Sequence, residues 1–443
     1  MKTVKKLLAF LALCFIAIVF AGCDLLDGSI ENLLSPPKPT IAQEGLKLAI
    51  ESVIGEDVRY IMPGTGNQRS SVKILEHSYN DAQWALVFYC DEENLGHIAV
   101  FKSEGENAWE FHKDFHENSM QIDFVESRDF TEDGLPELLV GWYHTENTKE
   151  MCAYNIFDGS SSASFNITYN ESRIFHGKGK DFIFTVYRER LNGKGTASIS
   201  ANDEGELKTV AECSMFGGYD NVKAITYGKI FNAQSVVLVD ASVGSSMVTQ
   251  VFKWSNRGLE NVFYDETEGI SPSLIRETAF TCTDIDGDGI IEMPYSVNLS
   301  EPKGMPSGMT KMVVTGWFTM NFPSVGKRTV GVLNRDFLCL MLPQQKYYYV
   351  IPYDWIGHIT AGYSSIDGSC TLYYTDEEGQ QQKLFSLKLI TEEEYSLQDD
   401  DAWQEVKKDG SKVYVIKTVV GLDDSLKKYT EGLQAHQNRL MLY

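Results

Sequence analysis

Positive charge is scarce in this chain of 443 residues. Lysine and arginine number 39 against 62 aspartates and glutamates, which gives a formal net charge of −23. The first 22 residues hold three of the lysines and no acidic residue, so the remaining residues carry −26. A surface this acidic repels both phosphate backbones and anionic lipid headgroups. We therefore expect no nucleic-acid partner, and we expect any membrane attachment to depend on something other than a basic patch.

Familiar catalytic motifs are also missing. The chain has no G-x-S-x-G nucleophile elbow, no Walker loop and no dinucleotide-binding fingerprint. His112 and His116 are four residues apart in a strand-like stretch and would share a face of a strand, but no carboxylate-flanked metalloprotease motif surrounds them. The sequence therefore predicts no catalytic residue, although an active site assembled from distant loops would leave no such motif.

Cysteine pairs of the C-x-x-C kind do not occur. Cys14 and Cys23 lie near the N-terminus, and the other six cysteines stand alone among apolar or aromatic neighbours. An exported protein is permitted disulfides. We favour the alternative, in which these six are small buried hydrophobic residues. They are Cys90, Cys152, Cys213, Cys282, Cys339 and Cys370.

The N-terminus has the three parts of a secretory signal over residues 1–22. A segment with three lysines precedes an apolar run from Leu7 to Phe20, and Ala21-Gly22 leads into Cys23. This ending resembles the lipobox of bacterial lipoproteins, with Phe20 where that family usually has leucine. The resemblance implies that Cys23 is lipidated and becomes the mature N-terminus. The alternative is an uncleaved membrane helix, but Leu7 to Gly22 is shorter than the roughly 20 residues that span a bilayer.

A tether, a short helix and then many strands are expected after the signal. Residues 23–40 form the tether and contain a proline-rich stretch. The apolar stripe that includes Leu46 and Ile50 predicts a helix over 41–56, which Gly55 is placed to end. From about residue 70 short apolar runs bounded by Gly, Asn or Asp predict a mainly β fold with no long helix before about residue 390.

The stretch from Asp284 to Glu292 is the most specific feature of the chain. Carboxylates occupy positions 1, 3, 5 and 9 of this loop, glycine occupies position 6, and a strand is expected to follow. Calcium takes six to eight oxygen ligands, so the spacing predicts a structural Ca²⁺ site. Tyr295 excludes an EF-hand, which needs glutamate at position 12. The predicted ligands are Asp284, Asp286, Asp288, the carbonyl of Ile290 and Glu292.

A second and weaker loop of this kind begins at Asp129. Thr131 stands where the first loop has its second acid, so this loop has one fewer negative charge and should bind a cation less tightly. Its predicted ligands are Asp129, Thr131, Asp133, Leu135 and Glu137.

The two loops belong to a repeat. Asp129 precedes Asp284 by 155 residues, about three periods of 52, and polar turns that lead into apolar strands occur at Asp181, at Asn232 and, one period earlier, at 78–81. Such a period with several strands per unit is typical of a β-propeller. The D-x-D-x-D-G loop resembles the FG-GAP/VCBS family of propeller repeats. Together with the lipobox it resembles VCBS-repeat lipoproteins of Firmicutes, which implies about 5–7 degenerate blades.

The propeller is predicted over residues 57–344, after which the periodicity fades. Residues 345–443 contain further strand candidates and a closing helix predicted from Asp424 to Arg439. We interpret them as a small C-terminal α+β domain; a last blade with a helical tail is the alternative.

Three functions remain open from the sequence. The first is a lipid-anchored binding or scaffold protein on the outer face of the bacterial cytoplasmic membrane, attached through Cys23 and recognising an envelope protein or a glycan. The alternative is an extracellular carbohydrate-active hydrolase or lyase on a propeller scaffold, which rests on analogy of fold. The third is a lipoprotein sensor or assembly factor whose C-terminal domain contacts a partner. The loops would be structural in each case.

Overall fold

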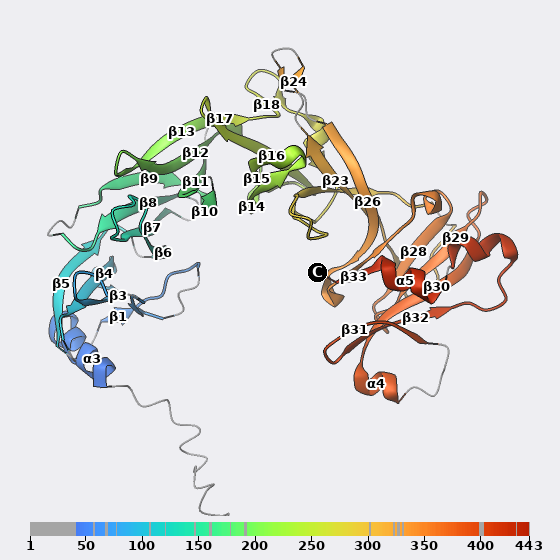
Figure 1. Ribbon diagram of the computed structural model, residues 1–443, viewed down its shortest axis with the longest axis horizontal. Coiled ribbons are helices and arrows are strands. Elements are labelled where there is room, and N and C mark those ends of the chain that lie inside the picture. The colour runs from blue at the N-terminus through green and yellow to red at the C-terminus, as the bar shows by residue number, and fades with distance from the viewer. Residues whose placement is uncertain are drawn as a thin grey trace, which may run out of the picture. The chain divides into compact units, whose positions relative to one another are not determined.

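The computed structural model describes residues 41–442 except 56–57, 67–69, 77, 106–107, 120, 146–147, 159–161, 178, 190–192, 301–302, 322–323, 326–327, 330–331, 398–402 and 431 (Figure 1). The predicted signal at 1–22, Cys23 and the tether at 23–40 lie outside the described residues. Among the residues described, no helix has both the length and the apolar character needed to cross a membrane.

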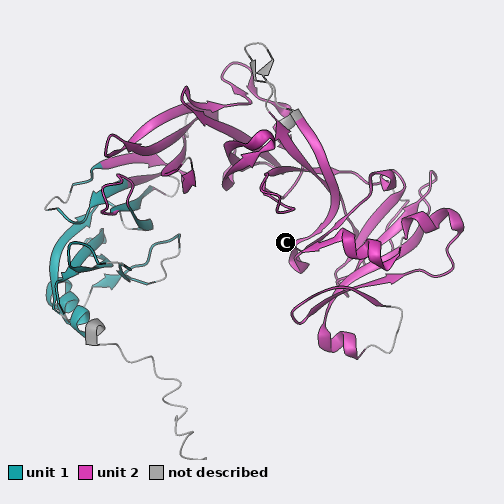
Figure 2. Ribbon diagram, in the orientation of Figure 1, with its two compact units in different colours: residues 1–128, 137–144, 152–164 teal, residues 129–136, 145–151, 165–443 magenta. Residues whose placement is uncertain are grey.

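The described chain is mainly β, as predicted, and its sheets contain many antiparallel strand pairs. None of the described sheets closes on itself. The chain divides into two compact units, which Figure 2 colours separately. The first unit comprises 1–128, 137–144 and 152–164, and the second comprises 129–136, 145–151 and 165–443.

Helix α3 (Ile41–Ile54) confirms the helix expected after the tether. Leu46 and Ile50 of its apolar stripe are buried against the first sheet, on the face that also carries Phe101. The helix ends at Gly55, whose φ of +97° is a left-handed conformation that glycine adopts without a Cβ clash.

Four successive sheets share one plan, in which four consecutive strands each pair with the next. The first contains β2 (Val72–Ile74), β3 (Gln83–Cys90), β4 (Gly96–Ser103) and β5 (Trp109–His116), with β1 (Arg59–Tyr60) also paired to β3. The second contains β6 (Ile122–Arg128), β7 (Glu137–Thr145), β8 (Thr148–Asn155) and β9 (Phe165–Tyr169).

The third and fourth sheets continue the series in chain order. The third contains β10 (Glu171–Gly177), β11 (Lys180–Arg188), β12 (Lys194–Asp203) and β13 (Glu206–Phe216). The fourth contains β14 (Asn221–Ile230), β15 (Gln234–Val243), β16 (Ser246–Ser255) and β17 (Gly258–Asn261). The leading strands of the four sheets begin at residues 72, 122, 171 and 221, so the repeat measured on the strands is close to the period of about 52 expected from the turns.

Neighbouring sheets pack face to face within each unit. In the first unit one hydrophobic cluster joins Phe88 and Val100 of the first sheet to Val140 and Trp142 of the second. In the second unit another joins Phe184 of the third sheet to Val239 and Phe252 of the fourth. This packing follows from strands that carry apolar residues on both faces, since each sheet then has to be covered on both sides.

Two further sheets follow the fourth. One has the order β21 (Glu292–Val297), β23 (Val314–Asn321), β26 (Val332–Leu342), β27 (Tyr347–Val350) and β33 (Leu440–Leu442). The other has the order β22 (Met309–Lys311), β28 (Ile359–Ser364), β29 (Cys370–Thr375), β30 (Gln381–Thr391), β32 (Lys412–Thr418) and β31 (Gln404–Asp409).

The remaining elements are short. They are the two-stranded pairs β18 (Tyr264–Asp265) with β19 (Gly269–Ile270) and β24 (Ser324–Val325) with β25 (Arg328–Thr329), the strand β20 (Ile275–Arg276), the helices α4 (Glu392–Ser396) and α5 (Leu433–Arg439), and the 3₁₀ helices η2 (Phe231–Ala233), η3 (Pro272–Leu274), η4 (Pro343–Gln345), η5 (Tyr353–Trp355) and η6 (Asp424–Tyr429).

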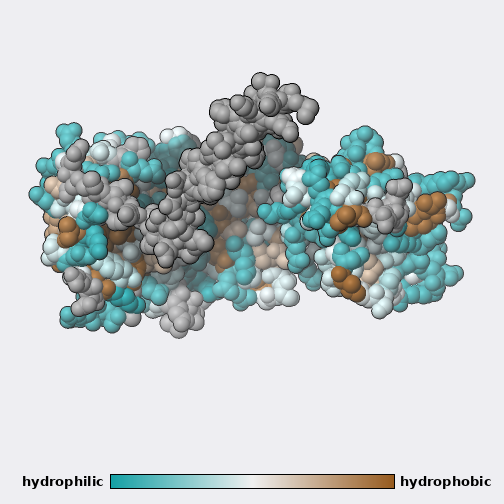
Figure 3. Space-filling model, turned by 90° about the horizontal axis from the view of Figure 1, so that it is seen from below, coloured by the Kyte–Doolittle hydropathy of each residue, from teal (hydrophilic) through white to brown (hydrophobic). Residues whose placement is uncertain are grey.

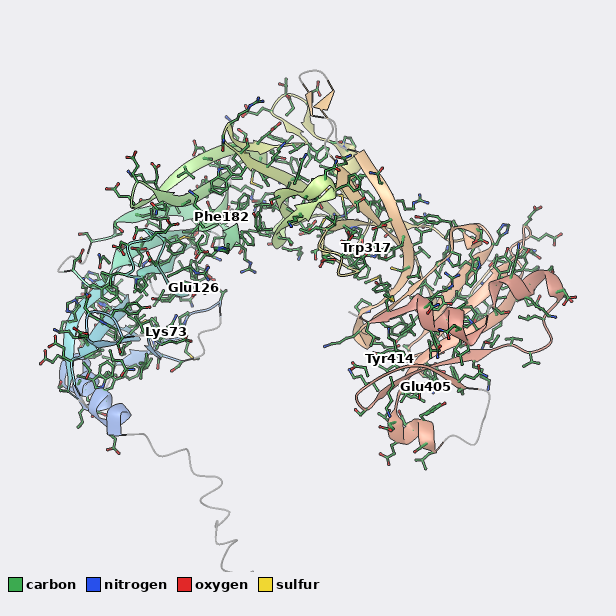
Figure 4. All side chains as sticks on the ribbon, viewed as in Figure 1. Lys73, Glu126, Phe182, Trp317, Glu405 and Tyr414 are labelled. Carbon is green, nitrogen blue, oxygen red and sulfur yellow. The ribbon has the colours of Figure 1, made fainter. Side chains whose placement is uncertain are left out.

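The last two large sheets share a hydrophobic core. Leu338 and Leu340 of β26 contribute to this core together with Tyr414 of β32, which Figure 4 labels. Cys339 and Met341, which alternate with these leucines, point to the opposite face of the same sheet and join a second cluster with Trp317. Strand β26 therefore connects the C-terminal core to the side of the sheet where the Asp284 loop lies.

The C-terminal region differs from expectation in one element. The predicted helix from Asp424 to Arg439 is instead two pieces, η6 and α5, because Gly432 adopts an extended conformation at φ −90° and ψ 163°. Sheet pairing also connects strands on both sides of the expected boundary at residue 345, since β26 pairs with β27. The boundaries 57–344 and 345–443 stay predictions.

A buried ion pair connects the fourth sheet to the segment that follows it. Arg276 Nη2 donates to Asp240 Oδ1 at 2.7 Å, and both side chains are almost completely buried. Asp240 also accepts from the backbone N–H of Cys282 at 2.7 Å and from the hydroxyl of Thr249, while Arg276 Nε donates to the carbonyl of Pro294 at 2.8 Å. One carboxylate and one guanidinium thus fix β15, β16, β20 and β21 relative to one another.

Removal of either member of this pair should destabilise the second unit severely. We expect Asp240→Leu or Arg276→Met alone to lower the free energy of unfolding by about 3–5 kcal/mol, because each leaves a buried charge without its partner. The double variant should be much closer to the parent protein, since it leaves no uncompensated charge. Urea denaturation of the four proteins measures these differences. Single variants as mild as the double variant would contradict this role.

Candidate functional site

The Asp284 loop is closed at its base by backbone pairing. The N–H of Thr283 donates to the carbonyl of Glu292 at 3.2 Å, and the N–H of Glu292 donates back to Thr283 at 3.0 Å. The N–H of Ile291 donates to the carbonyl of Lys229 at the end of β14, at 2.8 Å. Gly228 in β14 permits this approach, because a Cβ there would lie 2.6 Å from Ile291 Cδ1. The loop is therefore attached to the fourth sheet and runs directly into β21.

Inside the loop, the aspartate side chains accept hydrogen bonds from backbone N–H groups of the loop itself. Asp284 accepts from the N–H of Gly287 at 2.7 Å and, through its other oxygen, from the N–H of Gly289 at 2.9 Å. Asp286 accepts from the N–H of Asp288 at 3.1 Å. Each of the three aspartates offers an oxygen atom, and these atoms all lie within 4.8 Å of one another. The predicted ligands at positions 1, 3 and 5 are thus brought together.

Glu292 lies beneath these aspartates and is completely buried. Its Oε2 accepts from the N–H of Ile285 at 3.1 Å, whereas its Oε1 has no hydrogen-bond partner among the described residues. The pKa of this carboxyl is raised to about 8, mainly by burial and in part by the three nearby aspartates, while the hydrogen bond from the Ile285 N–H opposes the increase. A buried carboxylate oxygen with no donor, placed beside three acids, is the environment that a bound cation would compensate.

The donor set suits calcium. Hard cations prefer carboxylate and carbonyl oxygens, and Ca²⁺ accepts six to eight of them in flexible geometry. Four carboxylates from Asp284, Asp286, Asp288 and Glu292 with the Ile290 carbonyl would supply most of that number. Whether these residues hold calcium stays a prediction.

Ile285 anchors the loop to the sheet below it. Its side chain is buried in a cluster with Trp317, Met341 and Tyr348, and Figure 4 labels Trp317 on β23. The hydroxyl of Tyr348 also donates to the carbonyl of Ile285 at 3.5 Å. The apolar residue at position 2 of the loop therefore determines where the acidic residues are held.

Asp336 is a further acid near this loop that the sequence did not reveal. A β-bulge interrupts the pairing of β23 with β26, where Phe337 opposes Trp317 and Arg335 opposes Phe318, so that Asp336 is the extra residue. Burial raises the pKa of Asp336, and the charges of Asp286 and Asp288 raise it further. Nearly fifty residues separate it from the loop, so only the sheet pairing places it there.

The second loop has a similar internal arrangement. Asp129 accepts from the N–H groups of Asp133 and Gly134 at 3.1 and 2.9 Å. Ligand atoms of Asp129 and Asp133 lie within 4.8 Å of each other, whereas Glu137 begins β7 in the first unit. The carbonyl of Thr131 accepts from the side-chain amide of Asn202 at 2.7 Å, and Asp133 accepts from the N–H of Leu135 at 2.8 Å. Its predicted ligands include three carboxylates, one fewer than those of the first loop, as its sequence indicates.

The histidine pair considered from the sequence is separated. His112 is the extra residue of a bulge in β5, because Phe111 opposes Phe101 while Lys113 opposes Val100. Its ring packs edge-on against Trp84, and burial lowers its pKa. His116 instead stacks on a third histidine of β4. The bulge reverses the alternation of side chains, so residues four apart no longer share a face.

The six cysteines after residue 23 are all free, as expected, and five of them are buried. Burial raises the pKa of the Cys339 and Cys370 thiols to about 12, so these side chains are neutral hydrophobic groups.

Comparison with known proteins does not identify a family. No family model and no curated protein matches the chain. Among solved structures, an exo-β-1,3-galactanase from Clostridium thermocellum has a TM-score of 0.27 at 12% identity, covering 83% of this chain and 98% of that one. An exotype rhamnogalacturonan lyase has a TM-score of 0.30 at 9% identity, covering 74% and 83%.

A third solved structure has a different activity. A post-proline cleaving enzyme from Rickettsia typhi has a TM-score of 0.25 at 10% identity, covering 86% of this chain and 60% of that one. Likenesses at this level assign neither a family nor an activity to this chain.

Ile285 should matter more for stability than its neighbour in the same loop. We expect Ile285→Ala to lower the free energy of unfolding by about 2–5 kcal/mol, because it leaves a cavity among Trp317, Met341 and Tyr348. Ile290→Ala is the matched control and should cost clearly less, since Ile290 is only partly buried. Urea denaturation of both variants checks this expectation, and equal losses would contradict the anchoring role.

Proposed function

We propose that this chain is a calcium-stabilised β-propeller of the bacterial envelope that acts as a binding or scaffold protein. The observation that carries the calcium proposal is Glu292, a fully buried carboxylate with an unpartnered oxygen beside three aspartates. Calcium at this loop would hold the start of β21 against β14 and against the Ile285 cluster. The cation would therefore stabilise the join between the fourth sheet and the sheet that follows it.

Two observations support the propeller part of the proposal. Four successive sheets, each built around four consecutively paired strands, follow one another at a spacing of about 50 residues, which is the plan of propeller blades. Neighbouring sheets also share hydrophobic clusters face to face within each unit, as blades do. We propose that each sheet is one blade. The 5–7 blades expected from the sequence remain part of this proposal.

A binding role is the function that we favour for such a scaffold. Blades carry many inter-strand loops, which together offer a broad surface for recognising a protein or a glycan. In the view of Figure 3, hydrophilic residues cover most of the coloured surface and hydrophobic ones occur in small separate groups. Such a surface suits a polar partner, either an envelope protein or a glycan.

The alternative is a carbohydrate-active hydrolase or lyase on the same scaffold. Its substrates would belong to the classes named for the solved structures above, β-1,3-galactan and rhamnogalacturonan. Incubation of the full chain with these two polysaccharides separates the proposals. Release of oligosaccharides would favour the enzyme, and retention of the intact polysaccharide by the immobilised protein would favour the binding role.

Calcium should raise the melting temperature of the protein through Glu292. At a calcium concentration about 100 times Kd, binding to the folded state adds about 2.7 kcal/mol of stability. We expect Glu292→Gln to melt no lower than the parent protein in EGTA at neutral pH, because the neutral amide replaces a carboxyl whose raised pKa keeps it mostly protonated. In calcium it should lose most of the increase that the parent shows.

Two controls define this calcium experiment. Glu204→Gln, in the exposed turn between β12 and β13, should retain the full calcium response. Asp133→Asn in the second loop should reduce the response less than Glu292→Gln does. If the parent protein melts at the same temperature in calcium and in EGTA, the calcium proposal is wrong.

We further propose that Cys23 carries the lipid anchor on the outer face of the cytoplasmic membrane. Cys23→Ala should prevent lipidation and leave an unprocessed precursor or a protein released to the medium. Cell fractionation with a size comparison on a denaturing gel measures both effects. A variant that stays in the membrane at the size of the parent protein would support the uncleaved helix instead.

A further inference from the structure

Three aromatic rings form a row across the first sheet, at the end where the turn between β3 and β4 lies. Tyr89, His97 and His116 occupy directly opposed positions on β3, β4 and β5. The ring of His97 stacks on Tyr89 with centroids 4.9 Å apart and on His116 with centroids 5.0 Å apart. Tyr89 also packs against the cluster beneath α3, so the row continues the face that this helix partly covers.

A carboxylate joins the two histidines of this row. Asp114 lies two residues before His116 on β5, so both side chains leave the same face of the strand. Asp114 Oδ2 is 2.5 Å from Nδ1 of His97 and 3.6 Å from Nδ1 of His116. Ligand atoms of these three residues lie within 4.8 Å of one another.

Two further residues orient this group. Asp91 Oδ2 is 3.2 Å from Nε2 of His97, and Asp91 is itself held by the backbone N–H of Leu95 at 2.8 Å. Tyr89 donates its hydroxyl to Oδ1 of Asp114 at 3.2 Å, on the side away from the histidines. When Asp91 accepts a hydrogen bond from the Nε2–H of His97, the lone pair of His97 is on Nδ1, which faces Asp114. Metal-binding histidines in proteins are typically oriented in this way by a carboxylate on the second ring nitrogen.

We propose that His97, Asp114 and His116 bind a divalent transition metal of the zinc class. Nδ1 of His97, a carboxylate oxygen of Asp114 and Nδ1 of His116 would be three ligands, and water would occupy a fourth position. Imidazole nitrogens select zinc, copper or nickel over calcium, which prefers oxygen. The site therefore differs in metal class from the two aspartate loops.

The distances between ligand atoms require a small adjustment, and the ring of His116 has to turn out of its stack on His97 so that both imidazole lone pairs point at one metal. Bonds of about 2.0–2.1 Å in a tetrahedron place neighbouring ligand atoms roughly 3.3–3.5 Å apart. The separation between Asp114 and His116 is already close to this value, while His97 and Asp114 have to move apart by about 1 Å. His116 can move freely, since 62% of its side chain is exposed, whereas 13% of His97 is exposed.

Cobalt and zinc titrations of the full chain test this proposal. With excess calcium present to saturate the aspartate loops, Co²⁺ should produce the visible absorption of a tetrahedral site at one equivalent, and Zn²⁺ should remove it. We expect His116→Ala to weaken binding of both metals at least tenfold. Asp91→Asn should weaken it about 10–100-fold, because it removes the carboxylate that orients His97.

His176→Ala is the matched control. His176 also contacts a single carboxylate, Asp181, at 2.8 Å, but belongs to the third sheet, so its variant should bind as tightly as the parent protein. His116 is exposed, so its variant should fold even if a change at His97 does not. Absence of cobalt absorption and of zinc binding in the parent protein would overturn the proposal. Equal affinity of the parent and His116→Ala would overturn it as well.

Discussion

The buried ion pair of Asp240 and Arg276 is the constraint on which the join between the repeated sheets and the C-terminal region depends. Removing two charges from water costs free energy. The attraction between Asp240 and Arg276 offsets this cost, together with their hydrogen bonds to Thr249, Cys282 and Pro294. Those partners lie on β16, on the segment before the loop and on β21. The chain between the fourth sheet and the next one has only short elements, and the ion pair reinforces the pairing of β20 with β16 at this point.

The Asp284 loop depends on this arrangement from both ends. Cys282, held by Asp240, stands two residues before the loop, and Pro294, held by Arg276, stands two residues after it. Between them, Glu292 is buried beneath three aspartates while Ile285 is fixed among apolar residues. The apolar contacts around Ile285 hold the acidic side chains of the loop close together, where their negative charges repel one another. A bound cation is the simplest way to relieve that repulsion. We therefore propose that calcium has a structural role, and that the loops between the strands of the sheets recognise the protein or glycan partner.

Local patterns in the sequence predicted local structure well. The helix before Gly55, the strands at Trp84 and Val236, and the approach of the three loop aspartates all depend on residues close together in the chain. The sequence patterns did not predict features that depend on the pairing between strands. Asp336 reaches the loop through a bulge in β26, and His97 meets Asp114 and His116 only because β4 pairs with β5 in one register. A bulge at His112 likewise reversed the expected pairing of histidines, and no periodicity in a single strand indicates where a bulge occurs.

The central claim is that the Asp284 loop holds calcium through Glu292. The most direct measurement is a crystal structure grown with Ca²⁺, with anomalous scattering used to locate the ion. We expect a peak at about 2.3–2.6 Å from oxygens of Asp284, Asp286, Asp288 and Glu292, so that Glu292 Oε1 gains a partner. A loop without an anomalous peak in saturating calcium, with Glu292 Oε1 still unpartnered, would contradict it.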